Sequence, residues 1–351
     1  MHPIDQAYLS TVKPSFVTRR VKPEHIAWLE TGAGDLVSGD LVLAHVEELG
    51  HHSRLERPDG RRAMLFAGDE VLLACGARYA PDQFEADCPT SAGPAHLTAA
   101  GGIAGQVRAM HRRMKPATRL WILGAVCKED GSRINLSHYA LKVAKRATRL
   151  PVLAVCGTSM NAGKTHTIAA LVRGLSRVGH RVAAIKVTGT GAGGDLWFYR
   201  DSGAHHVGDF TDVGFASTYR APVERIFEGV GRLFADAEAA GADVIVLELA
   251  DGLLQQETAE ILQMAPFQAM LTSLVFAAQD AMGAQAGADW LRRFGLPLQA
   301  VSGAFTQSPL AVREVAATLD LPVLMPDRLQ DQDVVAGLLR PTPAVCLPAT
   351  A

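Results

Sequence analysis

The chain has 351 residues, of which 48% are hydrophobic and 20% are charged, and its formal net charge is −2. This near-neutral balance gives no electrostatic reason to expect nucleic acid or an acidic membrane surface as a partner. The sequence has no apolar run long enough to span a bilayer and no start typical of a signal peptide. It therefore predicts a cytoplasmic protein without a membrane span.

The length favours two domains. Residues 1–148 are predicted to form a smaller β-rich, barrel-like α+β domain of unknown role. Short apolar runs at 40–46, 62–66 and 70–75 are separated by turn pairs of glycine and aspartate. Short strands at this spacing are typical of a small antiparallel barrel or sandwich.

The end of this first half is predicted to be more helical. The Gly-rich stretch 99–105 opens a predicted helix that carries Val107, Met110 and Met114, and residues 137–147 form a linking helix. A loop-rich segment is predicted at 78–85, and a strand is predicted at 120–124. The Gly-rich stretch could bind an anion or could let a helix pack closely on a strand, and the motif alone does not decide between the two.

The strongest motif is Gly157-Thr-Ser-Met-Asn-Ala-Gly-Lys-Thr165, between an apolar run at 152–155 and an amphipathic run at 168–178. A strand, a Gly-rich loop and a helix in this order form a phosphate-binding loop, because backbone N–H groups and the helix dipole face the anion. Lys164 would reach the β- and γ-phosphates, and the Thr165 hydroxyl would coordinate Mg²⁺. The predicted nucleotide-binding residues are Gly157, Thr158, Ser159, Asn161, Ala162, Gly163, Lys164, Thr165 and His166.

Residues 149–345 are predicted to form an α/β P-loop domain with a mostly parallel sheet flanked by helices. Strands alternating with helices favour this architecture, and ligands then bind at the carboxyl ends of the strands. After the P-loop unit, strands are predicted at 181–187, 243–249, 273–277, 298–301 and 322–325, and helices at 223–240 and 309–319.

Charged residues stand at the carboxyl ends of two of these strands. Lys186 lies in an apolar strand, which is costly unless the amine meets an anion such as a substrate carboxylate or a γ-phosphate, or leaves the sheet into solvent. Glu248 ends a buried strand and is the expected magnesium ligand or water-positioning carboxylate, with Asp251 as a second candidate. Lys164, Lys186 and Glu248 are thus the predicted catalytic residues, and Thr165 and Glu248 the predicted metal ligands.

The stretch 188–220 is interpreted as a long, structureless lid or binding loop. Four of its side chains, with Lys186 and Asp251, are predicted to contact the substrate or the magnesium–phosphate group. These four are Thr188, Asp195, Arg200 and Asp209. His205 and His206 could contribute to a metal site, but adjacent residues of a strand point to opposite faces, which argues against one.

These motifs resemble those of dethiobiotin synthetase and of the cobyrinate and cobyric acid amide synthases. The shared features are a Gly-Thr opening, five residues between Gly157 and Gly163, a lysine at 186 and a Glu-x-x-x-Gly segment from Glu248 to Gly252. In that group, ATP activates a carboxyl or carbamate group by phosphorylation. The resemblance implies that the P-loop lysine binds phosphate, that Thr165 and Glu248 hold Mg²⁺, and that Lys186 contacts the reacting group of the substrate.

The segments 184–188 and 194–204 are also similar to the nucleotide-binding B protein of molybdopterin-guanine dinucleotide biosynthesis. The resemblance covers about residues 150–330. The chain departs from the synthetases at Leu249-Ala-Asp251, where they carry Gly-Ala-Gly. The loop 301–309 could contact the nucleotide base, and the choice between ATP and GTP stays open.

The leading hypothesis is an ATP- and Mg²⁺-dependent synthetase or ligase that activates a small carboxylic acid by phosphoryl transfer. The alternatives are a regulatory or metallocofactor-assembly NTPase that acts on a protein partner, and a small-molecule kinase. The expected ligands are ATP or GTP, Mg²⁺ and a small acid, with no nucleic-acid or membrane partner. Relatives of this P-loop class often form dimers, so the resemblance also implies a homo-oligomer.

Overall fold

The computed structural model describes residues 1–142 and 149–340, which divide into two compact units. The β-rich unit contains residues 1–142, Gly189–Gly194 and Phe210–Ala221. The P-loop unit contains the described residues of 143–188, 195–209 and 222–351. The sequence predicted one boundary, after residue 148, which lies outside the described part of the chain. The structure also assigns two later segments, Gly189–Gly194 and Phe210–Ala221, to the β-rich unit, which a single boundary cannot describe.

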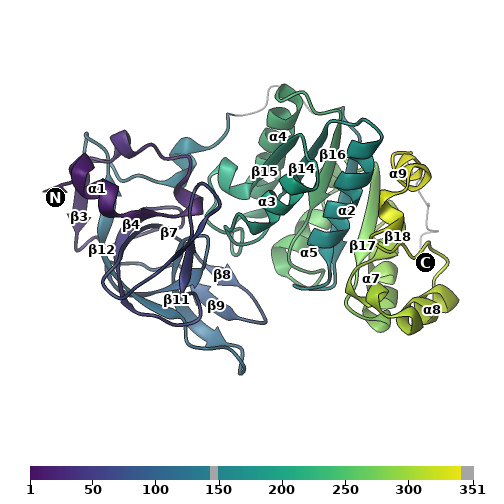
Figure 1. Cartoon of the computed structure of the whole chain (residues 1–351), viewed down its shortest axis with the longest axis horizontal. Helices are drawn as coiled ribbons and strands as arrows, with labels where there is room; N and C mark the ends of the chain where they lie inside the picture. Colours follow the sequence, from purple (N-terminus) through teal and green to yellow (C-terminus); the bar gives the residue numbers. More distant parts are fainter. Residues whose placement is uncertain (143–148, 341–351) are drawn as a thin grey trace. The chain divides into compact units, whose positions relative to one another are not determined.

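Five strands of the β-rich unit pair in a closed ring, in the order β12, β4, β7, β11, β10 and back to β12. The pairs are antiparallel except for β7 and β11, which run parallel. The core contains buried side chains from all five strands, such as Val42, Leu73, Leu97, Ala104 and Leu120. Purple to blue ribbons mark this part of the chain in Figure 1.

The elements of the β-rich unit are β1 (His2–Pro3), α1 (Gln6–Thr11), β2 (Lys13–Pro14), η1 (Phe16–Thr18), η2 (Pro23–His25), β3 (Trp28–Thr31), β4 (Leu41–Glu48), β5 (Arg54–Glu56), β6 (Arg62–Met64), β7 (Glu70–Cys75), β8 (Arg78–Tyr79), β9 (Phe84–Asp87), β10 (Gly93–Ala99), β11 (Ile103–Met110), β12 (Thr118–Cys127), η3 (Leu136–Tyr139) and η4 (Phe210–Val213).

The Gly-rich stretch 99–105 forms a hairpin and not the predicted start of a helix. It joins β10 to β11, and β11 also pairs with β7 and β9. Gly102 turns the chain with φ of +108°, and its N–H donates to the Ala99 carbonyl at 3.0 Å. A Cβ at Gly102 would also collide with Ser15. The helix prediction was wrong because β11 forms backbone hydrogen bonds with strands on both of its edges. This pairing outweighs the helical spacing of its apolar residues.

Two other predictions in this unit need correction. The predicted linking helix at 137–147 is a single 3₁₀ turn, η3, followed by non-helical residues at 140–142. Its remaining residues lie outside the described part of the chain. The segment 78–85, expected to be loop, contains β8 and the start of β9, which pair with each other.

The P-loop unit contains a six-stranded parallel sheet in the order β15, β14, β16, β13, β17, β18, as the alternation of strands and helices predicted. This order places β13 between β16 and β17, so the P-loop and the ends of β14 and β16 share one edge of the sheet. The elements are β13 (Val152–Gly157), α2 (Lys164–Arg177), β14 (Val182–Lys186), α3 (Gly194–Asp201), β15 (His206–Asp209), α4 (Val223–Ala239), β16 (Val244–Glu248), α5 (Gln256–Gln263), α6 (Ala265–Gln268), β17 (Ser273–Ala277), α7 (Ala281–Arg293), β18 (Leu298–Ser302), η5 (Ala304–Gln307), α8 (Pro309–Thr318), η6 (Arg328–Gln330) and α9 (Gln332–Leu338).

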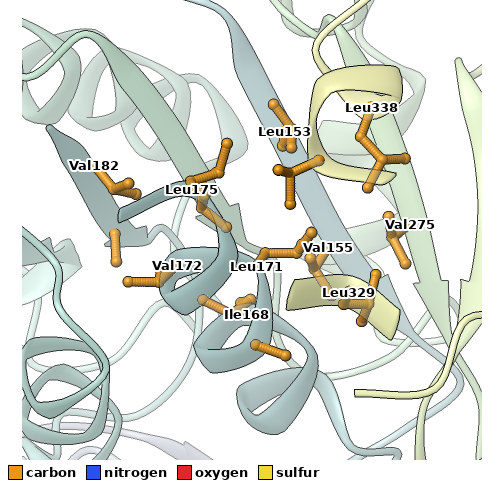
Figure 2. Packing of buried hydrophobic residues seen from close by; sticks show 14 of the residues in the cluster. Leu153, Val155, Ile168, Leu171, Val172, Leu175, Val182, Val275, Leu329 and Leu338 are labelled. Atoms are coloured by element: carbon orange, nitrogen blue, oxygen red, sulfur yellow. The ribbon is translucent and has the colours of Figure 1, made fainter. Parts of the chain in front are cut away.

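The helix that follows the P-loop is anchored on the sheet by apolar contacts. Ile168, Leu171 and Leu175 recur at helical spacing along α2 and are fully buried with side chains of β13 and β14. Leu329 of η6 and Leu338 of α9 join the same cluster (Figure 2). Burying a leucine or isoleucine contributes about 1.5–3 kcal/mol, so this cluster holds the start of α2 in place beneath the loop.

The stretch 188–220 is more ordered than the sequence predicted. It contains α3, β15 and η4, so the prediction of a structureless loop was wrong. The expected last strand at 322–325 is reduced to a single parallel bridge between Val323 and Val301. Among the described residues, no helix is both long and apolar enough to traverse a lipid bilayer.

Candidate functional site

The loop between β13 and α2 is held in a tight, defined conformation. Gly163 has φ of +92°, and a Cβ there would lie only 2.8 Å from the Ala304 nitrogen. The Ala304 N–H donates in turn to the carbonyl of Ala162 at 2.9 Å. Only glycine tolerates both this φ and this close approach, so the second glycine of the motif is required by geometry.

Lys164 begins α2, and its side chain folds back toward the loop. Its side-chain Nζ donates to the carbonyls of Ser159 and Asp251, each at 2.6 Å. The residue is only 6% exposed, and burial lowers the pKa of its amine. The positive charge therefore sits beside the backbone of the P-loop, where phosphate binding would compensate for the cost of burial.

Lys186 ends β14 and meets two carboxylates of its own chain. Its Nζ pairs with Asp195 and lies 3.6 Å from Glu248 Oε1. Burial by itself would lower the pKa of Lys186, but the charges of Asp195 and Glu248 raise it above its ordinary value. The amine is thus held as a cation at the sheet edge. Of the two interpretations that the sequence left open, it meets anions and does not leave the sheet into solvent, although these anions are protein groups.

Two carboxylates, those of Asp195 and Glu248, lie beside Lys186. Asp195 Oδ1 accepts a hydrogen bond from Thr165 Oγ1 at 3.2 Å, and Lys186 holds the pKa of Asp195 below its usual value despite burial. Glu248 is only 1% exposed, and burial raises the pKa of its carboxyl. Tyr199 donates its hydroxyl hydrogen to Glu248.

One cavity of about 790 Å³, a volume within the range of small-molecule sites, is lined by Lys164, Thr165, Lys186, Asp195 and Glu248. The P-loop and the ends of β14 and β16 form one part of its wall, and the β18–η5 connection forms another. The predicted site residues among its lining are Asn161, Gly163, Lys164, Thr165, His166, Lys186, Asp195, Glu248 and Asp251. The lining also includes Gly303, Ala304, Thr306 and Gln307, from the loop that the sequence suggested as a base contact.

Other predicted site residues do not line the cavity. Gly157, Thr158, Ser159 and Ala162 belong to β13 and the P-loop itself, whose backbone shapes the loop. Thr188 is buried and donates to the Ala250 carbonyl. Asp209 is buried at the end of β15, in register with Lys186.

Arg200 is exposed, and its guanidinium lies 5.8 Å from the Trp197 ring. The two adjacent histidines have structural partners, since His205 Nε2 lies 2.9 Å from the Ala240 carbonyl oxygen and His206 Nε2 lies 3.0 Å from Asp236. Within residues 1–142 and 149–340, no group of three or more His, Cys, Asp and Glu side chains could hold a metal ion by themselves.

Sequence reasoning missed Tyr199 and Phe198, because it assigned no helix to residues 194–201. Phe198 lines the cavity, and its ring stacks edge-on against His166 with centroids 5.3 Å apart. The signal was present in the spacing: Asp195 and Tyr199 are four residues apart, which places them on one face of a helix. Recognising α3 in the sequence would have brought both residues to the site together.

Comparison with known proteins identifies no family for the chain. No protein-family model matches it, and no curated protein matches it. The resemblance to dethiobiotin synthetase and the amide synthases therefore rests on the motif residues alone.

The chain is loosely similar to solved structures of the signal recognition particle receptor FtsY. One is that of Elizabethkingia anophelis in complex with GDP, with 14% identity over 58% of this chain and 67% of that chain and a TM-score of 0.37. Another is the chloroplast FtsY of Physcomitrella patens, with 15% identity over 59% of this chain and 70% of that chain, also at 0.37. Similarity this low carries no inference about function.

Proposed function

We propose that the chain binds a magnesium–nucleoside triphosphate in this cavity and transfers its γ-phosphoryl group to a small carboxylic acid. The observation that carries the proposal is the convergence of the P-loop, two lysines and three carboxylates on one cavity. Phosphoryl transfer depends mainly on positioning and on neutralising charge on the phosphoryl oxygens, which is what such a set of groups can do.

Each group has a distinct role in this proposal. The N–H groups of the P-loop and the amine of Lys164 would bind the phosphates, because both lie at the N-terminus of α2 where the helix dipole favours anions. Lys186 would neutralise the γ-phosphoryl group or the acid after exchanging its carboxylate partners for the ligand. Transfer forms an O–P bond to the carboxylate of the acid and breaks the bond to the nucleoside diphosphate.

The donor set fits magnesium, which prefers hard oxygen ligands. Thr165 and Glu248 are the predicted ligands, and Asp195 joins them because its carboxylate already contacts the Thr165 hydroxyl. When bound, the ion would neutralise charge on the β- and γ-phosphates. Asp195 was predicted to contact the substrate or the magnesium–phosphate group, and its contact with Thr165 favours the second of these roles.

A second candidate function is nucleotide hydrolysis coupled to a protein partner, as in a regulatory or metallocofactor-assembly NTPase. The pairing of Lys186 with Asp195 and Glu248 favours it, because an acid substrate would have to compete with two carboxylates for this amine. In that case Glu248 would position the water molecule that attacks the γ-phosphate, and no carboxylic acid would accept the phosphoryl group.

Thermal unfolding with ATP or GTP, with and without Mg²⁺, tests the shared part of both functions. A ligand at 100 times its Kd stabilises the native state by about 2.7 kcal/mol, so a clear rise in the midpoint is expected. Turnover is then measured with a panel of small carboxylic acids. Acid-dependent release of nucleoside diphosphate supports the synthetase, and release without any acid supports the NTPase. No midpoint shift with either nucleotide would rule out both.

A further inference from the structure

Tyr199 is the one aromatic hydroxyl that contacts the ionisable groups of this site among the described residues. It lies on α3, one helical turn after Asp195, and is 0% exposed. Its ring belongs to the apolar cluster between α2 and the sheet, while its O–H donates to Glu248 Oε2. The ring therefore fills the core, and only the hydroxyl reaches the polar site.

This contact constrains how Glu248 can turn. One carboxylate oxygen, Oε1, lies 3.6 Å from Lys186 Nζ, and the other accepts from Tyr199. A buried carboxylate with an ammonium group beside one oxygen and a hydroxyl donor at the other has one preferred orientation, since turning it away would break the hydrogen bond and separate the ion pair. Asp195 is held comparably, between Thr165 and Lys186.

We propose that Tyr199 is a positioning residue that orients Glu248 for Mg²⁺, so that α3 presents both carboxylates, Asp195 directly and Glu248 through Tyr199. This inference rests on the proposed function, in which Glu248 is a metal ligand. Groups that hydrogen-bond to metal ligands fix their orientation, and their loss typically costs about 10- to 100-fold in metal affinity.

The competing explanation is that Tyr199 only fills space in the core. The two explanations differ at a single atom, because phenylalanine keeps the ring and removes the hydroxyl. Tyr219 offers a matched control, since its hydroxyl also donates to a glutamate, Glu85 Oε1, at 3.0 Å, but in the β-rich unit.

The experiment measures the Kd of a fluorescent ATP analogue with Mg²⁺ and with EDTA, in the full-length wild-type chain and in variants. The ratio of the Kd in EDTA to the Kd with Mg²⁺ reports how much the metal strengthens binding. The Kd in EDTA alone reports whether the phosphate-binding loop is intact. Tyr199→Phe is expected to lower this ratio about 10-fold while leaving the Kd in EDTA unchanged. Tyr219→Phe is expected to change neither value.

A double-mutant cycle with Glu248→Gln isolates the route through Glu248. If Tyr199 acts through this carboxylate, the double variant has the same ratio as Glu248→Gln alone. Additive losses would overturn the proposal, as would an unchanged ratio in Tyr199→Phe or an equal loss of affinity with and without Mg²⁺. If wild type itself shows no nucleotide binding or no magnesium dependence, the proposed function is wrong. If Glu248→Gln loses the dependence and Tyr199→Phe keeps it, only the role of Tyr199 is wrong.

Discussion

Lys164 shows how one buried charge links stability to binding. Its amine is almost fully buried and donates to the backbone carbonyls of Ser159 and Asp251. Lys164→Ala should leave the fold intact, because it removes a costly buried cation together with these hydrogen bonds. Loss of a charge-assisted contact to phosphate should weaken nucleotide binding by about 3 kcal/mol, or roughly 100-fold.

Isothermal titration with ATP and Mg²⁺ measures this loss, and the thermal midpoint without ligand measures the fold. Lys22→Ala, at an exposed position of the β-rich unit, serves as the control for removal of a lysine. Wild-type affinity in Lys164→Ala would show that the P-loop is not the phosphate site.

His52 should make the β-rich unit less stable in acid. Burial and the charge of Arg78 lower its pKa from 6.5 to about 3. Below pH 6.5 the unfolded chain therefore binds a proton that the native chain does not, and stability falls as the pH drops toward 3. By pH 5 this loss should reach about 2 kcal/mol relative to pH 7.

Urea unfolding at pH 7 and pH 5 measures the effect. His52→Gln preserves an N–H donor for the Thr98 carbonyl, which the imidazole Nε2 faces at 3.0 Å, and it should reduce the difference between the two pH values. An identical difference in His2→Gln and His52→Gln would contradict the assignment to His52.

At the scale of elements, two helices respond oppositely to the same substitution. Gly231 lies within α4, and a Cβ there would meet no atom within 4 Å. Gly287 lies within α7, and a Cβ there would collide with the Phe276 ring of β17. Gly231→Ala should therefore stabilise the chain by about 0.5–1 kcal/mol, whereas Gly287→Ala should destabilise it by about 1–3 kcal/mol.

Paired thermal melts of the two variants test this prediction, with each serving as the control for the other. Two upward shifts would mean that helix propensity alone decides the outcome and that α7 does not pack closely on β17. A downward shift in Gly231→Ala would contradict the propensity argument for α4.

The elements also show where sequence patterns are reliable. Buried parallel strands have continuous apolar runs, so β13, β16 and β17 were predicted within a residue or two of their ends. The spacing of apolar residues in α2 predicted its buried face for the same reason. By contrast, β11 was predicted as a helix because its identity depends on partners that are distant in sequence.

At the scale of the whole molecule, a fragment ending at residue 148 should not reproduce the β-rich unit. The fragment lacks Gly189–Gly194 and Phe210–Ala221, which belong to that unit. The Gly193 N–H donates to the carboxylate of Glu56 at 2.8 Å, and Arg19 donates to Asp212 at 2.7 Å. Without these segments, Glu56, which is 3% exposed, and Arg19 would each lose a partner.

The fragment 1–148 should therefore melt at a lower temperature than the full chain, or show no cooperative transition. Circular dichroism melts of the fragment and of the full chain make the comparison. A cooperative transition of the fragment at the midpoint of the intact β-rich unit would show that the later segments add nothing to its stability.

The sequence by itself determined the Gly-rich loop, the parallel sheet that carries it and the charged residues at the strand ends that line the cavity. These features follow from local rules: a glycine-rich turn, apolar periodicity and the meeting of parallel strand ends at one edge. Only the tertiary structure decided that Lys186 pairs with Asp195 and Glu248, that Tyr199 donates to Glu248, and that two later segments belong to the β-rich unit. Side-chain partners and strand pairs distant in sequence leave no periodic signal, because packing in three dimensions selects them.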